Sequence, residues 1–389
     1  MASILKRFSH RAMVVGTAAL LTIGSFAVAQ EFRGDHPDTY VVKRGDTLWD
    51  IAGKFLKKPW LWPEIWQANP QIQNPHLIYP GDVISLAYLD RVIGVTPGPR
   101  TDGGPIGAIP LSEIEPYLKD LRVVDSFREL PYVVGQEEDI ARASRGMKVY
   151  VRGLDGAQLG QRYAVVRPVQ EYIRITQRTC CDLLSKRDFD YRGHQIPGFG
   201  TGWSEAASAD TGEFLGHELL KVNAGNVTAL PQGEAETVTV LLDDPTIEVR
   251  VGDRLIPIDL QPYDLQFFPH APAQALEYGK VRVLAVANSL TSGGPRDVIA
   301  ISAGKADGLD NGTVLSIWRQ GSNTPDRVAL GTWRGEETVR EGSKVRLPDE
   351  YAGHVMIFRA FDKVSYGLVM DSVKQSSVGY HLKHPDATY

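Results

Sequence analysis

The alternation of apolar and polar positions predicts a short helical region near the start of the chain and strands over most of the rest. A one-sided apolar stripe marks the first helix. Its positions stand at i, i+3, i+4 and i+7 and are Leu48, Ile51, Ala52 and Phe55. Thr47, with Asp50 three residues later, is typical of a capping box at a helix N-terminus. We therefore expect the chain to enter a helix directly after Thr47.

Turn and strand signals surround this helix. The segment from Tyr40 begins with a short strand and turns at Gly45-Asp46. Pro63 suits the first turn of a second short helix, because a proline loses no hydrogen bond there, and Asn69-Pro70 ends that helix. A Pro80-Gly81 turn then leads into a closing strand. The predicted order is strand, helix, helix, strand.

The later part of the chain is predicted to form strands, because its apolar runs are rich in β-branched residues and bounded by Gly, Asn, Asp or Pro. The clearest runs are 237–242, 281–287, 297–303 and 313–318. Helical periodicity there is confined to the short stretches 112–121 and 137–144. The expected fold class is multidomain α+β, in which a small βααβ domain is followed by two mainly antiparallel β modules.

Proline and glycine divide the chain into units. A linker is predicted at 95–110 and a Pro-rich connector at 263–274. They separate a small domain at 38–88 from one β-rich module at 111–262 and a second at 275–389. The lengths of the two later blocks suit one domain each.

The two β modules look duplicated, because three pieces of similar sequence occur in both in the same order. The pairs are LDGAQLGQRYAVVR (154–167) with ADGLDNGTVLSIWR (306–319), GHELLKVNAGNVTAL (216–230) with GHVMIFRAFDKVSYGL (353–368), and IEVRVGDRLIP (247–257) with SVGYHLKHP (377–385). Gly- and Ser-rich stretches at 198–212 and 320–337 also take related places. We expect these two stretches to be long mobile hairpin loops, where insertions are easily tolerated. Such loops can also carry function, but the first interpretation is favoured.

The start of the chain has the pattern of a secretory signal peptide. Three basic residues precede an uncharged, mostly apolar run at 12–29, which ends in small residues at the cleavage spacing. Cleavage is expected near Ala29/Gln30, so that residues 1–29 are removed. An uncleaved anchor is the alternative interpretation. The mature chain is expected to be periplasmic, with no membrane span after signal cleavage.

Removing this segment changes the formal charge from −5 to −8, because it carries three positive charges and no negative ones. The basic residues of the mature chain are scattered, which argues against a nucleic-acid partner. The two cysteines, Cys180 and Cys181, are adjacent and lack the CxxC spacing of redox or zinc sites. A passive pair is the favoured interpretation over a redox switch.

The residues of the small domain resemble a known family. YVVKRGDTLWDIA, Asn69-Pro70 and LIYPGDVISL are similar to the LysM (lysin motif) domain over residues 40–88. The longer KKPWLWP between the helices resembles the variant found in periplasmic LysM proteins of proteobacteria. The resemblance implies a βααβ fold that binds glycans containing N-acetylglucosamine, such as peptidoglycan.

The resemblance also implies where the glycan lies, between the first loop and the loop before the last strand. Most contacts would come from main-chain groups, which offer the donor and the acceptor that an acetamido group needs, beside aromatic surface for the sugar's C–H faces. The implied glycan-binding residues are Gly45, Asp46, Thr47, Leu48, Trp49, Pro75, Leu77, Ile78 and Tyr79.

Four of the seven tryptophans fall within residues 49–66. A domain this small can use large aromatic side chains as core or as a ligand platform. Trp62 is expected in the core, whereas both roles stay open for Trp49 and Trp60. Trp66 lies off the apolar face and is expected to join this domain to the next.

Candidate catalytic patterns are incomplete. Gly216-His217-Glu218 begins like the HExxH helix of zinc proteases, but Val222 stands in place of the second histidine. GWSEA (202–206) resembles a nucleophile elbow, yet it ends in alanine and is expected in a loop. His381 and His384 could meet a metal on one face of a turn, although a solvated tail is favoured. No catalytic residue, metal or cofactor is therefore expected, and the chain is predicted not to be an enzyme.

The sequence predicts non-catalytic binding of peptidoglycan through the N-terminal domain, which would anchor the β modules in the cell envelope. Two alternatives stay open. One is a cell-wall hydrolase that uses the LysM domain for targeting. The other is an envelope assembly or secretion factor whose β modules bind another protein.

Overall fold

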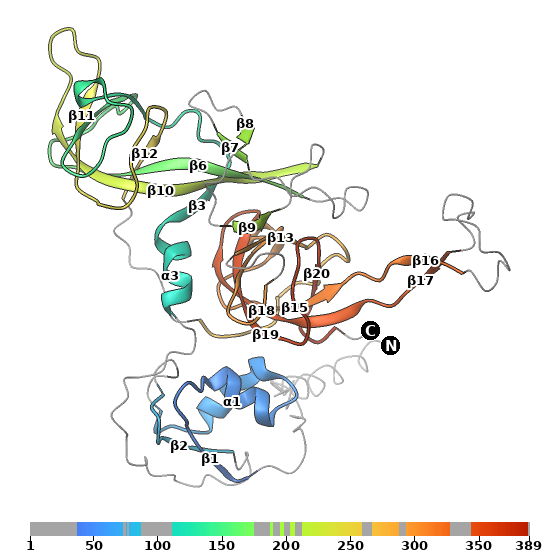
Figure 1. Ribbon diagram of the computed structural model, residues 1–389. Coiled ribbons are helices and arrows are strands. Elements are labelled where there is room, and N and C mark those ends of the chain that lie inside the picture. The colour runs from blue at the N-terminus through green and yellow to red at the C-terminus, as the bar shows by residue number, and fades with distance from the viewer. Residues whose placement is uncertain are drawn as a thin grey trace, which may run out of the picture.

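The computed structural model describes most of the chain after the first thirty-six residues (Figure 1). The described residues are 37–72, 75, 78–86, 111–174, 187–189, 195–197, 203–206, 212–258, 267–287, 293–326 and 344–387. Four predictions lie outside them, namely those for the signal peptide at 1–29, the linker at 95–110, the Cys180-Cys181 pair and Leu77.

The small domain has the predicted βααβ order. Its elements are β1 (Thr39–Val41), α1 (Leu48–Phe55), the 3-10 turn η1 (Pro59–Leu61), α2 (Trp62–Gln67) and β2 (Val83–Ser85). Strands β1 and β2 pair antiparallel, with Tyr40 opposite Ile84. Helix α1 begins after Thr47, whose hydroxyl accepts from the Asp50 amide while the Asp50 carboxylate accepts from the Thr47 amide. This reciprocal cap is the one that the sequence predicted.

Among the described residues, six strands of the first β module close into an antiparallel barrel around an apolar core. They are β4 (Tyr132–Gln136), β5 (Lys148–Arg152), β6 (Arg162–Arg174), β10 (Glu213–Ala229), β11 (Val238–Leu242) and β12 (Arg254–Pro257). Their order is β4-β5-β11-β10-β6-β12, and β12 pairs back to β4. Strand β3 (Leu121–Val124) adds to β10 outside the barrel.

The helix predicted at 112–121 is confirmed as α3 (Leu111–Lys119), which lies beside the second barrel and below the β6–β10 ribbon in Figure 1. The helix predicted at 137–144 is wrong beyond a single 3-10 turn, η2 (Glu137–Asp139). Ala143 instead forms an antiparallel bridge with Val249. Barrel closure thus overrides a weak local helical pattern.

The second β module forms a barrel of the same kind around its own apolar core. Its strands are β13 (Val283–Ala287), β14 (Val298–Ile301), β15 (Val314–Arg319), β18 (Glu350–Ala360), β19 (Ser365–Ser372) and β20 (His381–Lys383). Their order is β13-β14-β19-β18-β15-β20, and Arg282 bridges back to His381. Its 3-10 turn is η3 (Lys305–Asp307). The described parts of the chain also hold the short hairpins β7 (Arg187–Phe189) with β8 (Gln195–Pro197) and β16 (Asn323–Pro325) with β17 (Lys344–Arg346).

The two barrels have one strand order, position for position, so β4 to β12 of the first correspond to β13 to β20 of the second. Their closing bonds also match: the Val133 amide donates to the Asp253 carbonyl, and the Val283 amide donates to the Tyr380 carbonyl. Asp253 and Tyr380 are also the residues that the third pair of similar sequences aligns with each other. That the likeness reflects a duplication stays a prediction.

The second aligned piece is in the wrong register. Opposite Val165 of β6 stands Asn223, and opposite Ile317, the residue aligned with Val165, stands Gly353. Gly353 therefore corresponds to Asn223, seven residues after the Gly216 with which it was aligned. The physical reason is that β10 begins earlier than β18, so Gly216 lies in an extension of the β6–β10 ribbon beyond its own barrel.

The first β module contributes one strand to the sheet of the second. Residues Trp203–Ala206, expected in a loop within 198–212, form strand β9, which pairs with β13 at the edge of the second sheet. The β6–β10 ribbon also reaches over the second barrel (Figure 1). The loop prediction is wrong for β9 because its pairing partner belongs to the other module, and no local pattern reveals that.

Glu218 is fully buried where this ribbon meets the second barrel. Its carboxylate accepts hydrogen bonds from the hydroxyls of Tyr172 (2.5 Å) and Tyr366 (2.6 Å) and from Nε1 of Trp203 (2.8 Å). Desolvation raises the pKa of Glu218, although the three donors oppose that rise. The junction is therefore built around an acidic group that is costly to ionise.

Candidate functional site

Main-chain hydrogen bonds join the end of β1 to the turn before β2, next to the residues that the LysM resemblance assigns to the glycan site. The Val42 amide donates to the Asp82 carbonyl, and the Gly81 amide donates to the Val42 carbonyl, both at 2.9 Å. The Asp82 carboxylate accepts from the Tyr79 amide at 3.0 Å. These bonds hold the end of β1 and the Pro80-Gly81 turn against each other at one end of the small sheet.

Asp46 fixes the shape of the first loop. Its carboxylate accepts from the Lys43 amide (2.8 Å), the Tyr40 hydroxyl (2.8 Å) and Nζ of Lys54 (2.7 Å). Partial burial opposes ionisation, but these three donors outweigh it and lower the pKa of Asp46. The neighbouring Gly45 has φ of 92°, in the left-handed region that favours glycine. Asp46 thus organises the loop more than it offers a free carboxylate to a ligand.

The implied site residues divide into exposed and buried ones. Gly45 is exposed, and Thr47 and Tyr79 are half-buried. The buried members are Asp46, Leu48, Trp49, Pro75 and Ile78. A ligand at the loops would therefore meet main chain around Gly45 and Thr47, as the resemblance implied, while the apolar side chains support those loops from below.

The tryptophans are used as core and as a contact to the second barrel. Trp62 is buried as expected, and so are Trp49 and Trp60. Trp66 donates from Nε1 to the Ile72 carbonyl (2.6 Å) and stacks on Phe268, with ring centres 5.9 Å apart. Phe268 belongs to the 263–274 connector, so Trp66 joins this domain to the part of the chain that leads into the second barrel.

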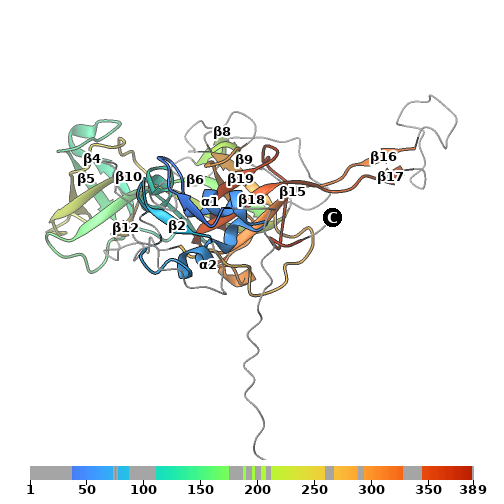
Figure 2. The same ribbon diagram turned by 90° about the horizontal axis from the view of Figure 1, so that it is seen from below.

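The small domain packs on the second barrel, although the first barrel follows it in the sequence (Figure 2). Rings of Trp60 and His354 lie 4.6 Å apart, and Trp49 and His354 meet edge to face at 6.4 Å. Lys58 pairs with Asp386 at 2.8 Å. Sequence reasoning missed this contact, because it depends on how the domains dock.

A cleft of about 460 Å³ opens along this contact. The small domain and the second barrel each supply one wall. The lining residues are Trp49, Asp50, Gly53, Lys57, Pro59 and Trp60 on one side and Tyr351, His354, Asp371, Ser372, Val373 and Pro385 on the other. Its volume falls within the range of small-ligand sites.

His354 is held firmly in the wall of the cleft. Its Nδ1 lies 3.0 Å from both carboxylate oxygens of Asp371 and 2.7 Å from the Tyr351 hydroxyl. Its main-chain amide also donates to Asp371 at 3.0 Å. Asp371 and Tyr351 therefore fix the orientation of the His354 ring in the wall.

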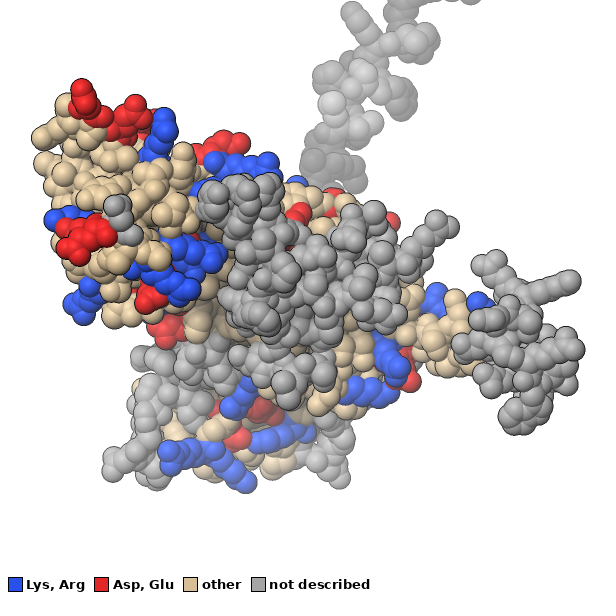
Figure 3. Space-filling view, turned by 45° about the horizontal axis from the view of Figure 1, so that its top comes forward, with Lys and Arg blue, Asp and Glu red and all other residues tan. Residues whose placement is uncertain are grey.

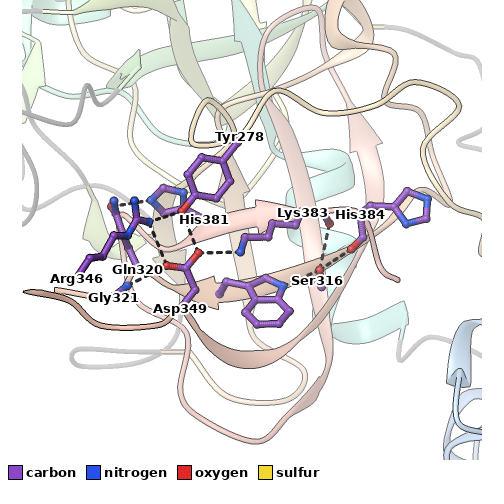
Figure 4. A network of polar contacts seen from close by, with 10 residues as sticks. Tyr278, Ser316, Gln320, Gly321, Arg346, Asp349, His381, Lys383 and His384 are labelled. Atoms are coloured by element: carbon purple, nitrogen blue, oxygen red, sulfur yellow. Dashed lines mark hydrogen bonds and ion pairs between the residues drawn. The ribbon is translucent and has the colours of Figure 1, made fainter. Parts of the chain in front are cut away.

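The residues of the incomplete catalytic and metal-binding patterns are not brought together in the described structure. His217 and Glu218 lie on strand β10 and point into different surroundings, with Glu218 buried against tyrosines and the His217 ring near Phe127 and Phe214. His381 is buried on β20, so the solvated-tail interpretation is wrong for it, and it points away from His384 (Figure 4). Across the described residues, no three His, Cys, Asp or Glu side chains are placed to hold a metal ion.

The polar network around Asp349 fixes the base of the β16–β17 hairpin (Figure 4). Asp349 accepts from Nζ of Lys383 (2.8 Å), the Tyr278 hydroxyl (2.9 Å) and the Gly321 amide (3.0 Å). Desolvation opposes ionisation, but these donors hold the pKa of Asp349 far below its usual range. Each partner is engaged within the network, which makes it a structural clamp.

Surface charge is mixed. On the face in Figure 3, Lys and Arg of the small domain, at the bottom, are interleaved with Asp and Glu. No helix within the described ranges is long and apolar enough to cross a membrane.

Comparison with known proteins identifies the N-terminal domain. Residues 40–87 match the LysM domain model. The chain is also similar to the uncharacterized protein YqbP of Bacillus subtilis (strain 168), with 42% identity over 60 residues. That match covers 13% of this chain and 27% of the relative, so it spans about a quarter of the relative's length. The LysM assignment thus concerns the small domain and leaves the barrels unassigned.

Proposed function

We propose that this LysM-bearing chain binds peptidoglycan through the groove between its first loop and the loop before β2, and so anchors its two β-barrels in the cell envelope. The observation that carries the proposal is the match of residues 40–87 to LysM, in a domain where Val42 at the first loop is hydrogen-bonded to the turn at Gly81 and Asp82. The exposed main chain at Gly45 offers the kind of surface that an acetamido sugar needs.

The proposal places the protein in the periplasm after signal cleavage, as a non-catalytic binder. Its support is the export pattern of the first 29 residues and the incomplete state of each catalytic motif in the sequence. Residues 57–63 resemble the variant found in periplasmic LysM proteins of proteobacteria, although the relative described above is from Bacillus subtilis. Peptidoglycan is the proposed partner, without nucleic acid.

Co-sedimentation with purified sacculi tests the groove. The substitution Gly45→Asn adds a side chain at an exposed loop position, and asparagine tolerates positive φ better than most residues. Its matched control is Gly146→Asn in the first barrel, where φ is 87° and an added Cβ also meets open space. We expect the unaltered chain and Gly146→Asn to pellet and Gly45→Asn to stay largely in solution. If all three pellet equally, the groove is not the binding site.

The hydrolase alternative is tested on the same material. Dye-labelled sacculi incubated with the mature chain are expected to release no dye above the buffer control. Release that persists in a second, independent preparation would refute the non-catalytic part of the proposal and leave the anchoring part standing.

A protein-binding role for the barrels is the second candidate. The β16–β17 hairpin projects away from the second barrel (Figure 1), and Val345 of β17 and Leu347 just after it are about half exposed beside Lys344 and Arg346. A projecting hairpin with exposed apolar and basic side chains suits a protein partner. Cross-linking in envelopes should then give a dominant adduct with the unaltered chain that Val345→Asp abolishes. An adduct that is insensitive to this change would argue against the hairpin.

A further inference from the structure

We propose that the cleft between the LysM domain and the second barrel is a second binding site for an N-acetylated amino sugar, which extends the LysM groove along one glycan strand. This inference rests on the proposed function. The cleft is a different place from the proposed LysM groove, because half of its wall comes from β18, β19 and the residues after these strands.

The cleft adjoins the groove through the start of α1. Asp50 lines the cleft, and its carboxylate accepts from the amide (3.1 Å) and the hydroxyl (2.8 Å) of Thr47, which belongs to the first loop. The first turn of α1 thus links the first loop to the cleft. We infer that a linear polymer lying over Gly45 and Thr47 would reach the cleft along this turn.

The chemistry of the walls suits a sugar. Trp49 and Trp60 line the base but are only 2% and 6% exposed, and polar groups stand around them on Lys57, Ser372 and Tyr351. A partly apolar cleft with hydroxyl and amine groups on its walls suits a pyranose, which has C–H faces and polar edges. Val373 is 74% exposed at the rim, which leaves apolar surface open there.

One buried donor supports a ligand with an acetamido carbonyl. Nε1 of Trp49 is buried and has no hydrogen-bond partner among the described residues. A buried indole N–H usually finds an acceptor. An acetamido oxygen bound at the base of the cleft would provide one after a small shift of the ring. The rigid Asp371–His354 pair meanwhile keeps the opposite wall in place.

The test measures affinity against ligand length by calorimetry on the full mature chain. The probes are the trimer and the hexamer of β-1,4-linked N-acetylglucosamine. Ser372→Arg puts a long side chain into the cleft, and Ser144→Arg is its control at an exposed position of the first barrel with the same charge change. Tyr351→Phe removes one hydroxyl from the cleft wall, and unfolding curves check that each variant is folded.

We expect the unaltered chain and Ser144→Arg to bind the hexamer about tenfold more tightly than the trimer. Ser372→Arg should remove that gain and keep trimer affinity, and Tyr351→Phe should lose about threefold on the hexamer. Hexamer binding by Ser372→Arg equal to that of the control would overturn the inference alone. If neither the unaltered chain nor any variant binds the trimer or the hexamer, both this inference and the proposed groove are wrong. If Gly45→Asn keeps all binding and Ser372→Arg loses it, the cleft stands and the groove fails.

Discussion

At the scale of single residues, Asn69 shows how one polar side chain holds the LysM domain together. It is fully buried; Nδ2 donates to the carbonyls of Ile65 (2.7 Å) and Ser85 (2.9 Å), and Oδ1 accepts from the Ser85 amide (2.7 Å). Asn69→Ala should lower the free energy of unfolding by about 2–4 kcal/mol, because the Ser85 amide then stays buried without this acceptor. Denaturant unfolding followed by tryptophan fluorescence measures the loss.

The control for this prediction is Asn226→Ala, at a half-buried position in the first barrel where the amide donates to Asp243 at 3.0 Å. Its expected loss is below about 1 kcal/mol, because solvent can replace the lost partner. Equal losses of unfolding free energy in the two variants would show that the hydrogen bonds of Asn69 stabilise the domain no more than those of a half-buried side chain.

Asp46 gives a prediction with a pH sign. Its pKa is lowered in the folded domain, so its stabilising contribution is present above the ordinary value of 3.8 and is lost as pH falls through the lowered pKa. A carbon-detected NMR titration of the Asp46 carboxyl should give a midpoint below 3.8. A midpoint at or above that value would mean that the bonds from Lys43, Tyr40 and Lys54 do not stabilise the anion.

Local residue patterns predicted the LysM domain well because its signals are local. The Thr47 cap, the apolar stripe of α1 and the Pro80-Gly81 turn each act within a few residues, and the structure has all three. Burial of Trp49 and Trp60 could not be predicted, since the surface that covers them is His354, some three hundred residues further on.

At the scale of elements, strand β9 depends on a long-range partner. Trp203 anchors it by donating from Nε1 to Glu218 (2.8 Å). Trp203→Phe keeps an aromatic ring in the cluster but removes that donor, and should cost about 2 kcal/mol. Trp318→Phe is the matched control, because Trp318 is equally buried and donates to the neutral Ser316 hydroxyl. Thermal unfolding of both should show the larger loss for Trp203→Phe, and the reverse order would contradict this view of β9.

The strands themselves could be predicted from β-branched runs, whereas their register and partners could not. Gly216-His217 and Gly353-His354 look alike in sequence but stand seven positions apart in the barrels, because β10 has an extension that β18 lacks. A strand repeats its pattern every two residues, so short similarities fit several registers. The register is set only by the complete set of inter-strand hydrogen bonds in the folded barrel.

At the scale of the whole molecule, the order of the domains in the sequence does not predict how they pack. The LysM domain contacts the second barrel through Trp60 and Lys58 and the connector before it through Trp66. The first barrel reaches the second through its β6–β10 ribbon and α3. The second barrel is thus the centre of the molecule.

The burial of Glu218 predicts that the junction of the two barrels is sensitive to pH. Burial raises its pKa above the ordinary 4.5, so the folded state holds its proton more tightly than the unfolded state does. The stability that this difference contributes is full below pH 4.5 and falls as pH rises toward the folded-state pKa, by at most about 1.4 kcal/mol per pH unit. Other carboxylates such as Asp46 change stability in the opposite direction, at lower pH.

Glu218→Gln isolates this effect. An amide can accept from Trp203 and donate to the Tyr172 and Tyr366 hydroxyls, which both donate and accept, so the variant keeps the junction hydrogen-bonded without a titrating group. Unfolding free energies measured between pH 4.5 and 8 should fall more steeply for the unaltered chain than for Glu218→Gln, whose advantage should grow with pH. Parallel curves would mean that Glu218 titrates normally, and that the three donors offset its burial completely.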